Sequence, residues 1–131
     1  MLKRQELRKI AQARLRDAEV LFRAKRYDGA FYLCGYALEV ALKARVCTSL
    51  RWQEFPATAG EFQGLTSFRT HDLDILLLLS GREQQVRSNH TAAWAVVVKW
   101  EPESRYRPIG SATRQQTQDM IDTVKRIMGA V

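Results

Sequence analysis

The stretch AFYLCGYALEVALKARVCTSL, residues 30–50, decides the fold because it is apolar on almost every side of a helix. A helix with so little polar surface packs against several neighbours at once, which predicts a position at the centre of a helical bundle. Its polar side chains form one narrow stripe, made by Tyr32, Tyr36, Glu39 and Lys43. Glu39 and Lys43 have the spacing of an ion pair along a helix.

Segments with helical periodicity flank this stretch on both sides. Apolar residues recur every three or four positions, which predicts helices over 3–25, 29–50, 71–80, 83–100 and 111–131. Most connections are short, so consecutive helices are expected to run antiparallel. The sequence therefore predicts an all-α fold with one domain, residues 1–131. Its architecture is an up-and-down antiparallel bundle of four long helices plus a short one.

Polar residues mark where these helices begin. Asp28 and Thr70 are expected to cap the helices that follow them, and Ser111 is expected to open the last helix. Within 83–100, selected residues recur at alternating spacings of four and three, a pattern that favours a core-facing seam or a subunit interface. The seam consists of Val86, His90, Ala93, Val97 and Trp100.

The segment 51–70 has neither helical nor strand periodicity, and it contains one proline and two glycines. Long connections in compact domains tend to be mobile or functional. The aromatic side chains of this segment are expected to anchor it to the bundle or to a second subunit. They are Trp52, Phe55, Phe62 and Phe68.

Positive charge is concentrated at the start of the chain. The formal net charge is +7, and residues 1–26 hold nine basic and three acidic side chains. Lys9, Arg16 and Arg23 fall on the face of the first helix opposite to its apolar stripe. Two interpretations stay open: contact with a polyanion such as nucleic acid or an acidic partner, or a solvated basic surface.

The two cysteines, Cys34 and Cys47, fall in one predicted helix. A rise of ~1.5 Å per residue separates them by ~20 Å, too far for a disulfide bond, so they are expected to be small buried hydrophobes in a reducing compartment. No paired-cysteine spacing occurs, and we expect no metal site and no cofactor. No segment resembles a signal peptide or a membrane span, which predicts a cytoplasmic protein that does not contact a membrane.

The segment ESRYRPIG, residues 103–110, interrupts the helical pattern. In it, Arg105 and Arg107 flank Tyr106. Arginine can grip a phosphate group bidentately, and tyrosine can stack on a base or donate its hydroxyl group. The segment is therefore either a simple turn between helices or a site for an anionic ligand.

Three segments, taken in order, carry a family resemblance. The first is YDGAFYLCGYALEVALKARV, residues 27–46, with the pattern A-L-E-x-x-L-K-A beginning at Ala37. The second is THDLDILLLL, residues 70–79, with a Thr-His-Asp-Leu opening on a short helix. The third is the pair Arg105 and Tyr106. Together they resemble the HEPN domain family, in the branch that carries an Arg-Tyr motif after its fourth helix.

The resemblance implies a bundle similar to the C-terminal domain of kanamycin nucleotidyltransferase and a tendency to form homodimers. HEPN domains often work beside a minimal nucleotidyltransferase as a toxin–antitoxin pair or in defence systems. Others are metal-independent RNases, and some have been proposed to bind nucleotides. The matching positions imply a ligand-binding cleft lined by Arg105, Tyr106, Arg107 and His71.

HEPN RNases use an arginine followed, after four to six residues, by a histidine. A neutral imidazole can take the proton of the 2′-hydroxyl group while the guanidinium stabilises the charge on the phosphate. Two residues separate Arg87 from His90, and seven separate Arg82 from His90. A single residue separates Arg69 from His71. The RNase motif is therefore absent, and His90 and His71 remain only as weak catalytic candidates. The structural alternatives are that His90 packs in the seam and that His71 helps to cap a helix.

Three hypotheses follow. The favoured one is a HEPN-like module, without catalytic activity or weakly catalytic, that binds a nucleotide, RNA or a nucleotidyltransferase partner. The proposed ligand-binding residues are Arg105, Tyr106, Arg107 and His71. The enzyme alternative is a metal-independent RNase toxin with a degenerate Arg/His site. The structural alternative is a homodimeric scaffold in which Arg105 forms an ion pair with Glu39 or another carboxylate.

Overall fold

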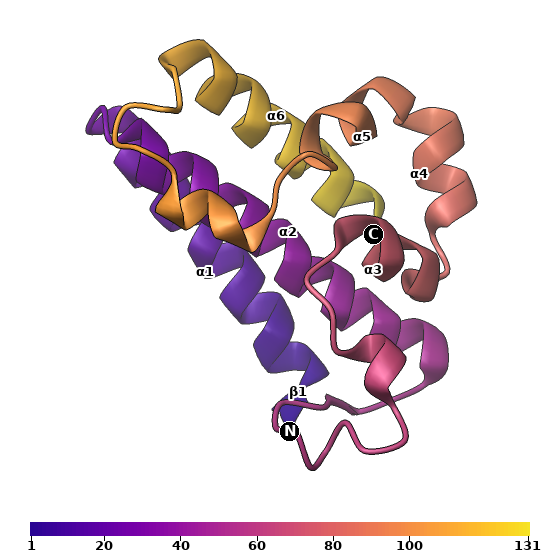
Figure 1. The fold of residues 1–131 in the computed structure, drawn as a ribbon. Coiled ribbons are helices and arrows are strands. Elements are labelled where there is room, and N and C mark those ends of the chain that lie inside the picture. Colours follow the sequence, from indigo (N-terminus) through magenta and orange to yellow (C-terminus); the bar gives the residue numbers. More distant parts are fainter.

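The computed structural model describes residues 1–131 and consists mainly of α helices (Figure 1). The helices are α1 (Arg4–Arg23), α2 (Tyr27–Leu50), α3 (Leu73–Ser80), α4 (Glu83–Asn89), α5 (Thr91–Val97) and α6 (Arg114–Ala130). The remaining elements are two short 3-10 helices and one antiparallel strand pair: η1 (Thr66–Phe68), η2 (Pro102–Tyr106), β1 (Leu2–Lys3) and β2 (Glu54–Phe55). The predicted all-α class is confirmed.

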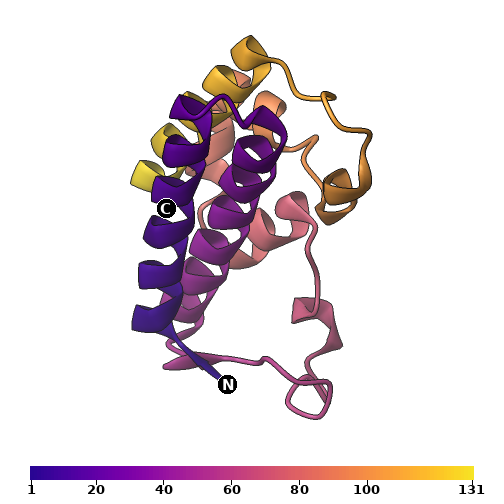
Figure 2. The same ribbon diagram turned by 90° about the vertical axis from the view of Figure 1, so that its left-hand side faces the viewer.

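Helix α2 lies at the centre of the bundle, as its composition predicts. α1 runs alongside it, and α3, α6 and η2 also pack against it (Figures 1 and 2). Leu38 and Leu42 are fully buried, and burial of each such side chain contributes about 2 kcal/mol. α2 therefore carries the largest share of the core. None of the helices is both long and apolar enough to span a membrane.

The predicted fourth long helix is wrong in one respect, because it is divided at His90 into α4 and α5. His90 has φ −135° and ψ 37°, outside the helical region. Serine, threonine and asparagine side chains compete with the backbone for hydrogen bonds, and the Thr91 hydroxyl donates here to the Arg87 carbonyl. After the break, the Trp94 indole N–H donates to Asp74 of α3 at 2.9 Å.

The predicted seam of this region faces the core of the same chain. Four of its five members are buried, namely Val86, Ala93, Val97 and Trp100. His90 is only half-buried, since it stands at the junction of the two helices. The seam therefore supplies packing within the bundle and not a surface for a partner subunit.

Two of the predicted helix starts are displaced by two residues. Asp72, and not Thr70, caps α3, because its carboxylate accepts hydrogen bonds from the first-turn amides. Thr113, and not Ser111, caps α6 and forms a capping box with Gln116. In each case two nearby residues are suitable as an N-cap. The helix begins after the one whose side chain reaches the free backbone amides of the first turn.

The connection 51–70 is packed against the end of the bundle. Phe55 and Phe62 are buried beside α1 and α2, and their ring centres lie 6.0 Å apart. Trp52 and Phe68 pack together with ring centres 4.9 Å apart. This confirms that the aromatic residues anchor the connection to the bundle.

Both cysteines lie in α2, buried and free. Burial raises the pKa of the Cys34 thiol to about 12, so this group stays protonated. The prediction that the cysteines are small buried hydrophobes is confirmed.

Candidate functional site

The polar residues of α2 face the segments that carry the predicted site residues. Tyr32, Tyr36, Glu39 and Lys43, here called the α2 stripe, recur at spacings of four, three and four and lie above one another on one helix face. η2 packs against α2, with Trp100 just before it contacting Tyr32, while the segment before α3 reaches Glu39 through His71. The stripe therefore joins two parts of the chain that are distant in sequence.

Glu39 is a carboxylate with only 2% of its side chain exposed. Its Oε2 accepts a hydrogen bond from Lys43 Nζ at 3.0 Å, and its Oε1 lies 3.0 Å from His71 Nδ1. A buried carboxylate is tolerated when it is paired and hydrogen-bonded in this way. The Lys43 pair confirms the prediction from spacing, whereas no local spacing could indicate His71, 32 residues away.

Glu39 also orients the imidazole of His71. In the neutral form, the proton lies on Nδ1 because the carboxylate accepts it, and Nε2 is left as the basic nitrogen. The His71 side chain is 65% exposed, and its one hydrogen bond within the chain is to Glu39. It does not cap α3, a role that Asp72 fills. A held imidazole with a free nitrogen can accept a proton or bind a polar ligand.

Arg105 and Tyr106 form an exposed pair in η2. The guanidinium carbon of Arg105 lies 4.8 Å from the centre of the Tyr106 ring, which is a cation–π contact. Hydrogen bonding by Tyr106 and then by Tyr32 raises the pKa of Arg105, so the guanidinium stays charged throughout the physiological range. The Tyr106 side chain is 75% exposed and offers a ring face to solvent or to a ligand.

The predicted ion pair between Arg105 and Glu39 is wrong. Glu39 is already engaged by Lys43 and His71, and no other carboxylate lies within ion-pair distance of Arg105. The cation therefore lies over the Tyr106 ring and has no carboxylate partner within the chain.

Aromatic rings connect the two ends of the α2 stripe. Tyr32 lies 6.4 Å from Tyr36 in a nearly parallel arrangement and 6.0 Å from the Trp100 ring. Gly35 permits this packing, since a Cβ there would lie 2.3 Å from the indole. Burial, followed by the charge of Glu39, raises the pKa of Tyr36, which keeps its hydroxyl group protonated as a donor.

The His71 end and the Arg105 end of the stripe are separated by about two helical turns. Tyr32 and Glu39 are seven residues apart, or ~10 Å along the helix axis. A hollow of about 320 Å³ lies between the segment that begins at His71 and the segment Trp100–Glu103. Arg105 lies two residues beyond this lining, at the edge of the same region.

Of the four predicted ligand-binding residues, Arg105, Tyr106 and His71 thus lie near the α2 stripe. Arg107 does not. Arg107 lines a separate hollow of about 550 Å³, together with Lys99 and Gln116. The sequence interpretation also missed Tyr32 and Tyr36 as parts of the site. Their signal was present, because they are polar residues at helical spacing on an otherwise apolar helix.

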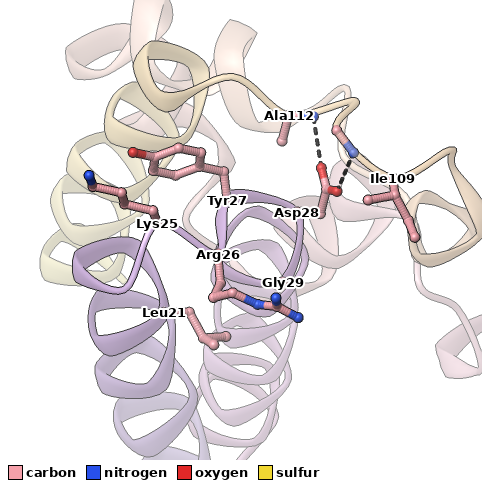
Figure 3. A pocket seen from close by; sticks show the side chains of 9 residues that line it. Leu21, Lys25, Arg26, Tyr27, Asp28, Gly29, Ile109 and Ala112 are labelled. Carbon is pink, nitrogen blue, oxygen red and sulfur yellow. Dashed lines mark hydrogen bonds between the residues drawn. The ribbon is translucent and has the colours of Figure 1, made fainter.

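Asp28 fastens the segment after Arg107 to the start of α2. It lies within the first turn of α2, so its prediction as the N-cap is wrong. Its carboxylate accepts hydrogen bonds from Gly110 N at 2.6 Å and Ala112 N at 2.9 Å, and these bonds lower its pKa (Figure 3). A hollow of about 420 Å³ lies beside this latch, bordered by the α1–α2 turn and Ile109 (Figure 3).

The second histidine has a different environment. His90 stands at the α4–α5 junction, away from the α2 stripe. The nearby Arg87 is engaged by Asp74 at 2.9 Å and by Glu83 at 3.9 Å. An arginine held by two carboxylates is poorly placed to serve a phosphate beside His90.

The basic face of α1 is a separate surface. Lys9, Arg16 and Arg23 are all exposed, and of the three only Lys9 has an ion pair, with Glu6 at 3.5 Å. Figure 2 shows α1 and η2 on opposite sides of α2. The α1 surface and the Arg105 surface therefore cannot belong to one compact site.

One known family resembles the first part of the chain. Residues 4–58 match the family model described as HEPN domain. Over these residues the chain is similar to the HEPN family. The match spans α1, α2 and part of the following connection, so it includes the whole α2 stripe and leaves His71 and Arg105 outside. No curated protein and no solved structure matches the chain. HEPN domains are helical modules associated with nucleotide binding and RNA cleavage, which directs attention to the stripe.

Proposed function

We propose that this protein is a HEPN-like module that binds a nucleotide unit, free or within RNA, at the η2 end of the α2 stripe. One observation carries the proposal: Arg105 is charged, exposed and free of any carboxylate partner, beside the exposed ring of Tyr106. A phosphate group supplies the charge that the chain itself does not supply. A base supplies a flat surface for the tyrosine.

In the proposed binding mode, different groups of the ligand contact the two ends of the stripe. Arg105 binds a phosphate group, and Tyr106 stacks on the attached base. His71, ~10 Å along the helix, offers Nε2 to a sugar hydroxyl group or a neighbouring phosphate. Arg107 lies beside a separate hollow and is assigned at most a long-range electrostatic contribution.

The experiment is a binding titration with AMP, ATP and a short single-stranded RNA, followed by calorimetry or fluorescence polarisation. Arg105→Gln and Tyr106→Ala should each weaken binding at least about tenfold, because each removes a contact of about 1–3 kcal/mol. Arg126→Gln is the matched control, since Arg126 is an exposed arginine of α6 without an ion pair. Equal affinities for Arg105→Gln and the control would refute the proposal.

A second candidate function is a metal-independent RNase, and one observation favours it. The buried Glu39 holds Nδ1 of His71 and leaves Nε2 exposed, an arrangement suited to a general base. RNA cleavage in the presence of EDTA, abolished by His71→Ala and retained by His90→Ala, would establish this function. Cleavage that survives both substitutions would assign the activity to a contaminant.

The remaining parts of the proposal rest on the resemblance to the HEPN family. We propose that the protein is cytoplasmic, forms homodimers and works beside a nucleotidyltransferase in a toxin–antitoxin or defence system. The packed α4–α5 seam removes one argument for a dimer, so the family tendency alone supports it. Sedimentation velocity tests the dimer. Co-purification with a nucleotidyltransferase encoded by the neighbouring gene tests the partner.

A further inference from the structure

A cluster of three arginines lies on the side of α2 opposite to the α2 stripe. Arg45 follows Lys43 by two residues, and two residues rotate a helix by about 200°, to the other side. Arg8 approaches from α1. Arg82 lies in the turn between α3 and α4, which packs on the end of α2, since a Cβ on Gly81 would lie 3.1 Å from Ser49 Oγ. Residues distant in sequence thus bring three cations to one end of the bundle.

Local contacts place these arginines. Arg8 Nη2 donates to the Thr48 hydroxyl group at 3.0 Å, which ties it to the last turns of α2. The Ser49 hydroxyl donates to the Ser80 carbonyl and so fastens the end of α3 to the end of α2. Gly81 then turns the chain with φ +75°, and Arg82 follows directly.

The three charges have no compensation within the chain. Lys9, Arg14 and Arg87 each contact a carboxylate, but Arg8, Arg45 and Arg82 form no ion pair. The Nε atoms of Arg45 and Arg82 are removed from solvent and lack hydrogen-bond partners.

Repulsion within the cluster is visible at Arg45. Burial and then the nearby charges of Arg82 and Arg8 lower the pKa of this guanidinium. Like charges at close range destabilise the structure that holds them, and a bound anion would reverse the sign of that contribution.

A small hollow of about 180 Å³ opens beside Arg8 and Arg45, with Ala11, Ala44 and Met128 in its walls. Pockets for whole small molecules usually measure about 300–1,000 Å³, so this one suits a smaller group. Arginine prefers oxyanions, whose geometry matches its fork of donors. We infer that Arg8, Arg45 and Arg82 bind a phosphate group, either inorganic phosphate or diphosphate or a phosphate of an RNA strand.

The inference stands apart from the proposed nucleotide site. Arg105 and the arginine cluster lie on different sides of α2, and no residue is common to both. Failure of one proposal therefore leaves the other intact.

The test is a thermal unfolding series with inorganic phosphate and diphosphate against sodium chloride of equal ionic strength. Phosphate should raise Tm of the wild-type protein by about 2–4 °C. Arg45→Gln should raise Tm in chloride, because it relieves repulsion, and should abolish the phosphate response. Arg126→Gln, at an exposed arginine outside both proposed sites, should keep the full response.

Arg82→Gln provides a second variant at a turn, in case Arg45→Gln disturbs α2, and circular dichroism checks the helix content of both. An unchanged phosphate response in both variants overturns the inference, and so does a wild-type protein that does not respond. Titration with single-stranded RNA distinguishes the source of the phosphate. Weaker RNA binding by Arg45→Gln assigns the site to an RNA phosphate, and unchanged RNA binding assigns it to a small free anion.

Discussion

The charged side chains at the two ends of the α2 stripe have opposite environments. At one end Glu39 is buried, and both of its oxygens are engaged by Lys43 and His71. At the other end Arg105 is exposed and has no carboxylate partner. A charge that is fully paired stabilises the fold, whereas a charge left unpaired at the surface is available to a ligand. One helix face therefore has a structural end, at Glu39, and an end that we propose binds a ligand, at Arg105.

This comparison predicts that substitutions at the buried end lower the free energy of unfolding, while those at the exposed end alter binding. The aromatic contacts between the ends, Tyr32 with Tyr36 and Trp100, belong to the structural part.

Glu39→Ala should lower the free energy of unfolding by about 3 kcal/mol, because it leaves the ammonium group of Lys43 poorly solvated and unpaired. Chemical denaturation measures the change. Glu103→Ala is the control, since Glu103 is exposed and forms no ion pair, and it should change stability by less than about 0.5 kcal/mol. Similar values for the two variants would remove the distinction between the two ends.

Gly35→Ala should cost about 2 kcal/mol by overpacking, because the new Cβ would lie 2.3 Å from the Trp100 indole. Thermal unfolding measures the loss. Gly129→Ala is the matched substitution in α6, where a Cβ would meet nothing within 4 Å, and it should stabilise the helix slightly. If both variants gain stability, the close approach of Trp100 to α2 is wrong.

Asp28→Asn should cost about 1 kcal/mol at neutral pH, because it weakens the hydrogen bonds from Gly110 and Ala112. The pKa of Asp28 is lower in the folded than in the unfolded state, so its contribution is present above the unfolded value of about 3.9 and is lost as pH falls through the folded value. Unfolding curves between neutral and acidic pH should therefore converge for variant and wild type. Parallel curves would contradict the latch.

Tyr106→Ala should change the free energy of unfolding by less than about 0.5 kcal/mol, because the side chain is mostly exposed. Denaturation of this variant beside Tyr36→Ala gives the contrast, since Tyr36 is half-buried and packs on Tyr32. A larger loss for Tyr106→Ala than for Tyr36→Ala would make the exposed end structural.

Much of the fold follows from local patterns in the sequence. The apolar run of α2 leaves no alternative to a central helix, and the amphipathic patterns place α1 and α6 against it. The break at His90 was not predicted, because the apolar spacing continues across it while polar side chains nearby disrupt the backbone locally. Helix starts were displaced where two capping residues stand close together, as with Thr70 and Asp72.

The candidate site is less accessible to sequence reasoning. Helical spacing predicts the stripe itself and also the ion pair of Glu39 with Lys43, which the structure contains. The contacts of His71 with Glu39 and of Arg105 with Tyr32 depend on how distant segments return to α2. Tertiary packing determines such contacts, and no local period encodes them. The role of Asp28 changed for the same reason, because its partners are more than 80 residues away.

The most direct test of the account measures two quantities on Arg105→Ala: the free energy of unfolding and the dissociation constant for a short single-stranded RNA and for ATP. The account predicts unfolding within about 0.5 kcal/mol of wild type and binding at least about tenfold weaker for the ligand that the wild type binds. A variant that loses stability while its affinity for both ligands is unchanged would contradict the account and make Arg105 a structural residue.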